Sequence, residues 1–315
     1  MRAMITMLLV LAAQAAPAAP PRPSQLKLFR DWTVGCDNGR FCQAVALIPQ
    51  GWPDGAATMG VRRGSEPGAP TRVNFELTGD ADAAAASHLE ADGRRIPVRL
   101  MMGETGPEAA AADMPALLSA FRSARALRIV GRSGETLGTV SLAGATASLL
   151  YMDEAQRRPA PPLPAVRSPR PGSGAPIAVT RTLAASLRKR HGCEIGEVGG
   201  PDDIEAFTIA PGTSLLLMAC GSGAYNVTHI ALIAQRGQTR LARYDTAETS
   251  LINAGWDKDK GLLSSYSKAR GLGDCGTSQS FAWDGARFRL VHQESMGECQ
   301  GSVDYITTWR ARVVR

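Results

Sequence analysis

The chain of 315 residues lacks the features that most directly indicate a function. After the N-terminal region, no stretch approaches the length of about 18 apolar residues that a membrane-spanning helix requires. Aromatic residues make up only 5% of the composition and do not alternate with basic residues, which argues against nucleic acid as a partner. No Cys-x-x-Cys pair occurs, so the usual redox and structural zinc motifs are excluded.

Candidate catalytic residues are also sparse. The histidines are isolated from one another: His88, His191, His229 and His292. His229 lies in an apolar stretch that is typical of a core strand, not of a metal site. We therefore expect no catalytic residue, no metal ligand and no cofactor. The competing hypothesis is a hydrolase whose site assembles only in three dimensions, with a carboxylate beside His229, His292 or Ser265.

The N-terminus has the pattern of an export signal. Arg2 precedes the apolar stretch 3–13, which is too short to span a bilayer, and small residues that suit a signal peptidase follow. We assign 1–18 to a signal peptide. The preference for Arg over Lys and the abundance of Ala indicate a GC-rich bacterium. The expected location is therefore the periplasm of a Gram-negative cell.

What the chain does contain is an even number of cysteines, and in an exported protein these indicate disulfides. Cys36 and Cys42 enclose a short loop between two predicted strands, so we expect them to pair. The other four allow three pairings: Cys193, Cys220, Cys275 and Cys299. Chain order favours Cys193–Cys220 and Cys275–Cys299, because each bond would then join neighbouring elements.

A proline-rich segment divides the mature chain. Residues 155–176 contain seven prolines and little aliphatic bulk, which predicts an extended linker without a core. With the linker taken as 154–176, an N-terminal domain spans 26–153 and a C-terminal domain with four cysteines spans 177–315. Each segment is long enough for an ordinary hydrophobic core.

Both segments consist mainly of predicted strands. In the first, alternation predicts a strand over 28–34 and another over 44–48, Asp113 predicts a helix N-cap, and a further helix begins near Ala145. In the second, a helix over 180–190 precedes several strands, and Asp284-Gly285 predicts a hairpin turn. We expect a mainly β protein with a few short helices, built from two β-sandwich-like or α+β domains that disulfides staple.

Positive charge is concentrated around the linker. No acidic residue occurs between Glu154 and Glu194, whereas eight basic residues do: Arg157, Arg158, Arg167, Arg170, Arg181, Arg188, Lys189 and Arg190. Such a segment suits contact with an anionic envelope component or another envelope protein. The simpler alternative is a solvated linker that its like charges keep extended.

Two short patterns match ligand-binding loops only superficially. Gly271-x-Gly273-x-x-Gly276 matches a dinucleotide fingerprint, but its flanks are strand-like and Cys275 interrupts it, which favours a turn pinned by a disulfide. The run 257–261 opens like a calcium loop, yet Lys268 stands where a bidentate Glu is needed. The loop 271–279 is a candidate for the exposed, rigid loop of an inhibitor.

Three separated segments carry a resemblance to a known family. They are 29–38 (FRDWTVGCDN) with Cys42, 267–276 (SKARGLGDCG), and Trp283-Asp284-Gly285 with Phe288 and Cys299. Together they resemble the exported bacterial family catalogued as domain of unknown function 1176, over essentially the whole mature chain. The resemblance implies six cysteines and no established activity. The N-terminal half also resembles the invasion-associated locus B proteins, which implies a β-sandwich module.

These observations lead to a functional expectation. We expect an exported protein that binds or supports components of the bacterial envelope and does not catalyse a reaction. The alternatives are a periplasmic hydrolase and a secreted inhibitor or virulence-related factor.

Overall fold

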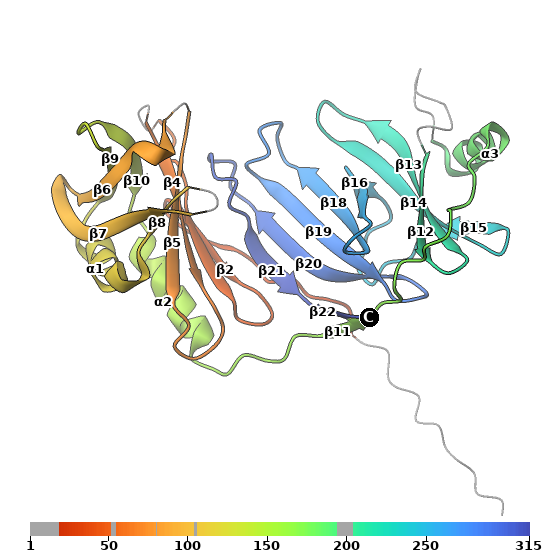
Figure 1. The fold of residues 1–315 in the computed structure, drawn as a ribbon, viewed down its shortest axis with the longest axis horizontal. Coiled ribbons are helices and arrows are strands. Elements are labelled where there is room, and N and C mark those ends of the chain that lie inside the picture. Colours follow the sequence, from red (N-terminus) through yellow and green to blue (C-terminus); the bar gives the residue numbers. More distant parts are fainter. Residues whose placement is uncertain (1–18, 52–54, 80, 104–105, 194–203) are drawn as a thin grey trace, which may run out of the picture.

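The computed structural model describes residues 19–51, 55–79, 81–103, 106–193 and 204–315. The predicted signal peptide, 1–18, lies outside these residues, and so does Glu194. The described chain is mainly β with a few short helices, which confirms the prediction of a mainly β protein (Figure 1). The helices are α1 (Met114–Ser123), α2 (Ala145–Gln156) and α3 (Arg181–His191), with short 3-10 turns at Ala83–Ala85 and Ala111–Asp113.

The strands of the N-terminal half form one sheet, here called the N-terminal sheet, in the order β1-β2-β3-β4-β5-β8-β7-β6-β9-β10. They are β1 (Lys27–Phe29), β2 (Trp32–Cys36), β3 (Cys42–Ala46), β4 (Ala57–Arg63), β5 (Thr71–Leu77), β6 (Ala86–Ala91), β7 (Arg94–Met102), β8 (Pro107–Ala109), β9 (Ala126–Gly131) and β10 (Thr136–Ser141). The sheet bends back on itself, because Ala56 beside β4 forms a bridge with Thr139 of β10. Its core includes Leu117 of α1 and Met152 of α2.

The first strand differs from the prediction. Instead of one strand over 28–34, β1 ends at Phe29 and β2 starts at Trp32, which is the antiparallel partner of Phe29. Arg30 adopts φ 53°, a left-handed conformation that turns the chain back. The Trp32 ring is completely buried, and its indole N–H donates to the Ser141 carbonyl at 3.0 Å. Trp32 is therefore a core residue.

The C-terminal half contains two sheets that pack face to face. The outer sheet consists of β12 (Ile204–Ala210), β13 (Thr213–Ser222), β14 (Val227–Gln235), β15 (Gln238–Leu241) and β16 (Leu251–Ile252). The central sheet consists of β17 (Gly255–Asp257), β18 (Leu262–Lys268), β19 (Gly276–Trp283), β20 (Phe288–Met296) and β21 (Ile306–Arg310). The predicted hairpin is confirmed, since Trp283 of β19 pairs with Phe288 of β20 around Asp284 and Gly285.

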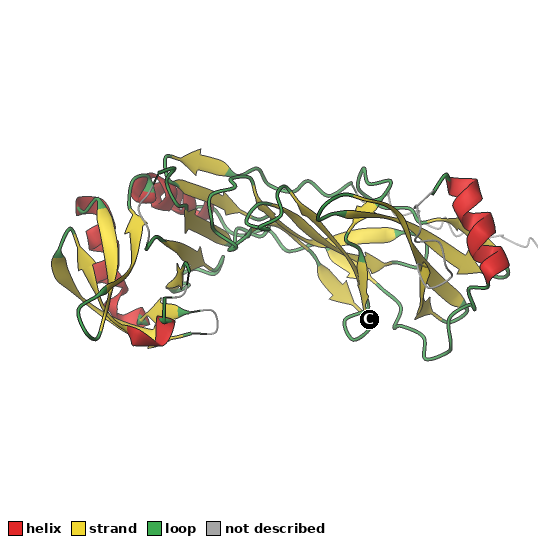
Figure 2. Ribbon diagram, turned by 90° about the horizontal axis from the view of Figure 1, so that it is seen from above, coloured by secondary structure: helices red, strands yellow, loops and turns green. Residues whose placement is uncertain are grey.

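The alternation along β13 explains how these layers stack. Leu215 and Leu217 point into the core that the outer and central sheets share, whereas Leu216 and Met218 pack with Leu187 of α3 on the other face. Both faces of the strand are buried, and its sequence is accordingly a continuous apolar run. In Figure 2 the helices lie at the two ends of an elongated molecule and strands fill the middle.

The predicted linker is extended but not free. Helix α2 continues to Gln156, so the first residues of the predicted linker are helical. Its strand β11 (Ala165–Arg167) pairs in parallel with β22 (Arg312–Val314) at the C-terminus of the chain. The Val166 side chain is buried against Ala282 and Val291 of the central sheet. Backbone pairing and apolar contact, not only charge repulsion, hold this segment extended.

Three disulfides occur in the structure. Cys36–Cys42 joins directly opposed residues of β2 and β3, Cys193–Cys220 joins the end of α3 to β13, and Cys275–Cys299 joins the start of β19 to the loop after β20. These are the pairs that chain order favours. No helix in the described ranges is both long enough and apolar enough to cross a membrane.

Candidate functional site

The N-terminal sheet meets the central sheet along a polar interface, here called the polar seam. Along β3 the residues Cys42, Ala44 and Ala46 point into the N-terminal core, so Gln43 and Val45 point outward, and yet these two are 5% and 1% exposed. Val45 and Leu47 pack against Cys275, Met296 and Ile306 of the C-terminal half. The polar seam consists of Asp37, Asn38, Gln43, Arg62, Asn74 and Glu76 on one side and Asp304, Thr307 and Arg310 on the other.

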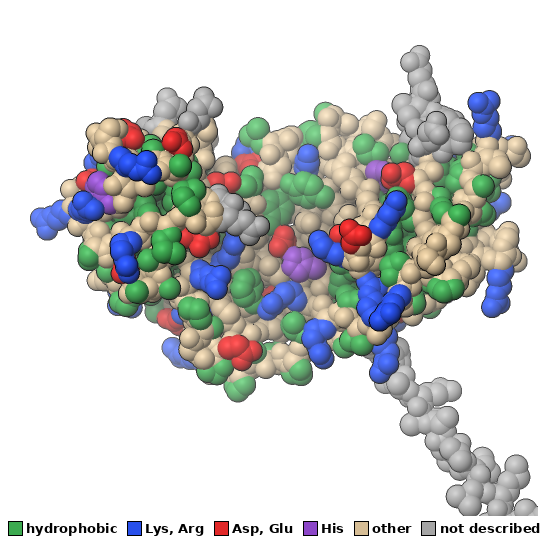
Figure 3. All heavy atoms as spheres, viewed as in Figure 1, with side chains coloured by type: hydrophobic (Ala, Val, Ile, Leu, Met, Phe, Trp, Pro, Cys, Tyr) green, Lys and Arg blue, Asp and Glu red, His purple; other side chains and the backbone are tan. Residues whose placement is uncertain are grey.

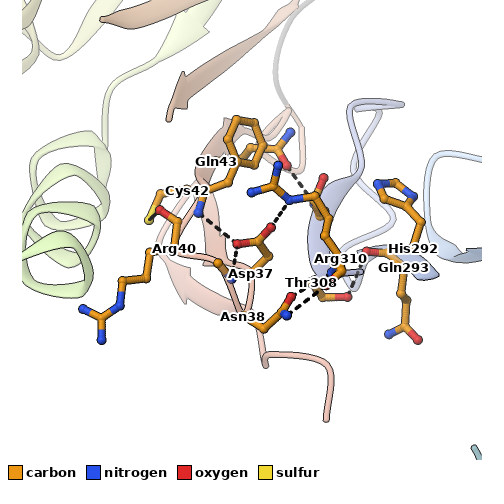
Figure 4. Close-up of polar contacts among 12 residues, drawn as sticks. Asp37, Asn38, Arg40, Cys42, Gln43, His292, Gln293, Thr308 and Arg310 are labelled. Atoms are coloured by element: carbon orange, nitrogen blue, oxygen red, sulfur yellow. Dashed lines mark hydrogen bonds and ion pairs between the residues drawn. The ribbon is translucent and has the colours of Figure 1, made fainter. Parts of the chain in front are cut away.

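At one end of the seam, Asp37 forms an ion pair with Arg310 (Figure 4). One oxygen of the fully buried Asp37 carboxylate accepts hydrogen bonds from the backbone N–H groups of Gly39 and Phe41, at 2.8 and 2.9 Å. Asn38 accepts from the Arg310 backbone N–H at 2.7 Å and donates to the Arg310 carbonyl at 2.9 Å. A buried carboxylate with this many partners is a structural clamp, because its charge and its hydrogen-bonding capacity are already satisfied.

In the middle of the seam, the Asp304 carboxylate reaches the outer face of the N-terminal sheet. It accepts from the Arg62 guanidinium at 2.5 Å and from the Asn74 amide at 3.0 Å. Gly60 makes this approach possible: a Cβ atom there would lie 2.5 Å from Asp304 Oδ2 and 2.6 Å from Asn74 Oδ1. The absence of a side chain at residue 60 therefore creates the space for the carboxylate.

Glu76 lies next to Asp304 in the seam. Its burial, and after that the negative charge of Asp304, raise the pKa of the Glu76 carboxyl group. Hydrogen bonds from the Thr58 hydroxyl, at 3.3 Å, and from the Val303 backbone partly oppose this effect. The fold therefore disfavours the charged form of Glu76.

A cleft of about 680 Å³ opens beside the seam, between the N-terminal sheet and the central sheet. Its lining residues are Phe41, Gln43, Arg62, Tyr266, Lys268, Leu272, Gly273, Ser278, Glu294, Val303, Asp304, Tyr305 and Thr307. Across the central sheet, Tyr266 lies opposite Ser278, Ser278 opposite Glu294, and Glu294 opposite Thr307. Directly opposed residues of neighbouring strands share a face, so this row of four side chains forms one wall of the cleft.

The two tyrosines of the cleft are held by a single carbonyl. The hydroxyls of Tyr266 and Tyr305 donate to Gly273 O at 2.8 and 3.1 Å, and their rings pack edge to face. Gly273 adopts φ 73°, in the left-handed region that glycine tolerates. Burial and the neighbouring Tyr266 hydroxyl raise the pKa of Tyr305. The Tyr305 hydroxyl therefore stays protonated, and the shared hydrogen-bond acceptor makes both tyrosines fixed structural groups of the wall.

The loop between β18 and β19 forms the rim of the cleft. Asp274 accepts hydrogen bonds from the Arg270 guanidinium at 2.7 Å and from the Gly301 backbone N–H at 2.8 Å, and the bond to Arg270 lowers the pKa of Asp274. Together with the Cys275–Cys299 disulfide, these contacts fix a loop whose tip, Leu272, is 78% exposed. In the apparent dinucleotide fingerprint, Gly271 and Gly273 thus lie in a β-hairpin loop and Gly276 begins β19, so no strand–helix turn forms there.

The residues of the hydrolase hypothesis do not line this cleft. The Ser265 hydroxyl donates to the Ile252 carbonyl at 3.1 Å and accepts from the Ile252 N–H at 3.0 Å, so it ties β18 to β16. His229 Nδ1 lies 3.3 Å from the Ala254 nitrogen, and burial lowers the pKa of His229. His292 Nε2 lies 3.7 Å from Glu294. None of these contacts joins a nucleophile to a general base.

The structure does not bring the eight predicted basic residues together. Arg157 follows α2 and pairs with Glu154 at 2.9 Å, Arg167 is exposed on β11, and four of the eight are in α3. Figure 1 places α2 and α3 at opposite ends of the molecule, and in Figure 3 the basic side chains are scattered over the visible face. A common anion-binding patch does not form among them.

Other titratable side chains do not assemble into a metal site in the part of the chain that the structure describes, where no three His, Cys, Asp or Glu residues gather. In the apparent calcium loop, Asp257 instead accepts the backbone N–H groups of Asp259 and Lys260 at 3.0 and 2.8 Å. These hydrogen bonds make the run a polar turn.

The polar seam is the part of the site that sequence reasoning missed. A local signal existed at Asp37-Asn38, two polar residues directly after a buried strand and inside a disulfide loop. Gly60 was a second signal, since a glycine inside a strand indicates that another group approaches closely. Neither signal identifies its partner, which is more than 200 residues away in the sequence.

This chain is similar to known proteins in sequence and, over part of its length, in structure. The chain is 26% identical to the uncharacterized protein YpfG of Escherichia coli (strain K12), over 99% of this chain and 100% of the relative. It is also similar to the crystal structure of invasion associated protein b from Bartonella henselae, with 15% identity and a TM-score of 0.32, over 43% of this chain and 100% of the other. Residues 26–312 match the family described as "Protein of unknown function (DUF1176)", and the chain therefore belongs to this family.

Proposed function

We propose that this protein is an exported, non-catalytic binding module of the bacterial cell envelope, and that its ligand occupies the cleft beside the polar seam. One observation carries the proposal: the cleft wall presents polar groups that other residues leave unused. Within the described residues the Ser278 hydroxyl has no hydrogen-bond partner, and the Lys268 ammonium has no carboxylate partner. Partly buried groups of this kind, beside fixed tyrosines, are typical of a binding site.

The proposed location is the periplasm, reached through a signal peptide at 1–18. The three disulfides support it, because an oxidising compartment allows them to persist. We also propose that 26–153 and 177–315 are two domains and that 154–176 joins them. The basic residues that we assigned to an anionic partner would then act as separate contacts, at the end of α2 and on α3.

Export is tested on the full chain with a C-terminal tag in a Gram-negative host. We expect the tagged protein in the periplasmic fraction, with a new N-terminus within 13–20. An intact N-terminus on protein found only in the cytoplasm would overturn the proposed location.

Envelope binding is tested by co-sedimentation of the oxidised protein with washed envelope fragments. Leu272→Glu places a charge on the cleft rim, where the native side chain is 78% exposed, so folding should be unaffected. Leu241→Glu is the matched control, because Leu241 is 48% exposed on β15 and lies outside the cleft. We expect Leu272→Glu to reduce sedimentation and Leu241→Glu to leave it unchanged. An equal response of both variants, or no sedimentation of the wild type, would refute the proposal.

A further inference from the structure

We propose that the ligand of this cleft is a short, uncharged saccharide, an inference that rests on the binding function proposed above. The volume of about 680 Å³ lies inside the range of about 300–1,000 Å³ that is usual for small-molecule sites. The ligand class follows from the polar groups on the wall, from their balance of charge and from the apolar rim.

The wall of the central sheet alternates hydrogen-bond donors and acceptors. Ser278 offers a hydroxyl, its neighbour Glu294 a carboxylate, and Lys268 an ammonium group 5.7 Å above the Tyr266 ring. Among the described residues, the only side chain within ion-pair distance of Glu294 is the His292 imidazole, at 3.7 Å. A sugar hydroxyl donates and accepts at the same time, so a row of adjacent sugar hydroxyls can satisfy such a mixed wall.

The balance of charge disfavours an ionic ligand. Arg62 is committed to Asp304 at 2.5 Å, which leaves Lys268 and Glu294 as one cation and one anion on the same wall. A polyanion would meet Glu294 and Asp304, and a polycation would meet Arg62 and Lys268. An apolar ligand would strip water from Ser278, Lys268 and Glu294 without replacing its hydrogen bonds. A neutral polyhydroxyl ligand avoids each of these costs.

The rim supplies apolar surface that a saccharide also needs. Leu272 and Val303 are 78% and 54% exposed, and they lie beside Gly273 and Asp304 respectively at the mouth of the cleft. The C–H faces of pyranose rings are apolar, so they can cover these side chains while the hydroxyls face the polar wall. The tyrosine pair, fixed by Gly273 O, needs no rearrangement before the ligand binds.

The test is calorimetric titration of the oxidised mature chain with four probes: chitotriose, maltotriose, trialanine and sodium phosphate. We expect saturable binding of at least one trisaccharide and none of trialanine or phosphate. Ser278→Ala and Glu294→Gln should each weaken trisaccharide binding by about three- to tenfold, the loss expected for one hydrogen bond. Ser280→Ala is the matched control, because Ser280 lies two residues along the same strand on the same face but outside the cleft, and it should bind like the wild type.

The alternative outcomes separate this inference from the proposed function. If neither trisaccharide binds although Leu272→Glu still reduces envelope sedimentation, the saccharide class is wrong and the binding function stands. If trialanine or phosphate binds and Ser278→Ala or Glu294→Gln weakens it, the class is also wrong. If a trisaccharide binds equally to the wild type and to both cleft variants, the site is wrong.

Discussion

Arg310, near the C-terminus, forms an ion pair with the buried carboxylate of Asp37, 273 residues earlier in the chain. The pair joins β21 of the central sheet to the loop between β2 and β3. The Arg310 guanidinium also lies 4.9 Å above the Phe41 ring, at the edge of the cleft. Asp37 therefore connects the stability of the polar seam to the geometry of the proposed binding site.

Replacing Asp37 by Ala should destabilise the protein strongly. The substitution leaves the Arg310 guanidinium and the N–H groups of Gly39 and Phe41 without their acceptor, so we expect a loss of about 3 kcal/mol in the free energy of unfolding. Denaturant unfolding of the oxidised protein measures it. Asp153→Ala is the control, because the side chain of Asp153 is 53% exposed in its pair with Arg63, and its loss should stay below about 1 kcal/mol. Equal losses would contradict the clamp role of Asp37.

Adding a methyl group at residue 60 should disrupt the middle of the seam. In Gly60→Ala the new Cβ would collide with the Asp304 carboxylate, so we expect a loss of about 1–3 kcal/mol. Thermal unfolding provides the measurement. Gly221→Ala in β13 is the matched control, since no atom lies within 4 Å of the corresponding Cβ position. If Gly60→Ala left the free energy of unfolding unchanged, the position of the Asp304 carboxylate would not depend on the space at residue 60.

The raised pKa of Glu76 predicts a specific pH dependence. Because its pKa is higher in the folded state than the unfolded value of 4.5, ionisation of Glu76 destabilises the fold as pH rises above that value. Glu76→Gln removes this cost, so the stability of the variant relative to the wild type should increase between about pH 4 and pH 7. Urea denaturation across this range tests the sign.

Asp274 should give stability a pH dependence opposite to that of Glu76. Its pKa lies below the ordinary value of 3.8, mainly because Arg270 donates a hydrogen bond to its charged form. The stability that it contributes is present above pH 3.8 and is lost as pH falls through its folded-state pKa. The deficit of Asp274→Asn should therefore shrink in acid. A deficit that grows in acid would contradict the assignment.

The three disulfides should differ in how much they contribute to the free energy of unfolding. Cys275–Cys299 and Cys193–Cys220 span 24 and 27 residues, whereas Cys36–Cys42 spans 6. Loop-closure entropy predicts a loss of about 3 kcal/mol when either longer bridge is replaced by two alanines, and about 2 kcal/mol for the short one. Unfolding of the three double variants checks this order, and non-reducing peptide mapping of the wild type checks the pairs. A larger loss for the Cys36–Cys42 variant than for the other two would contradict the predicted order.

Features that depend only on neighbouring residues can be read directly from the amino-acid order. Thr180 accepts a hydrogen bond from the Leu183 N–H at 3.2 Å and begins α3 where the pattern predicts a helix. Asp284-Gly285 produces the expected hairpin. These features are readable because backbone preference and side-chain periodicity act over a few residues.

Contacts between groups that are distant in the sequence depend on the three-dimensional packing. The carboxylate of Asp113, expected to cap α1, instead accepts hydrogen bonds from Arg99, at 3.0 Å from its backbone N–H. The proline-rich linker is held by pairing between β11 and β22, and the polar seam joins strands from opposite ends of the chain. Local patterns show that Asp37 and Asp304 are polar and that Gly60 leaves room for another group. Their partners follow from the packing of one sheet on another, which satisfies buried charges across hundreds of residues.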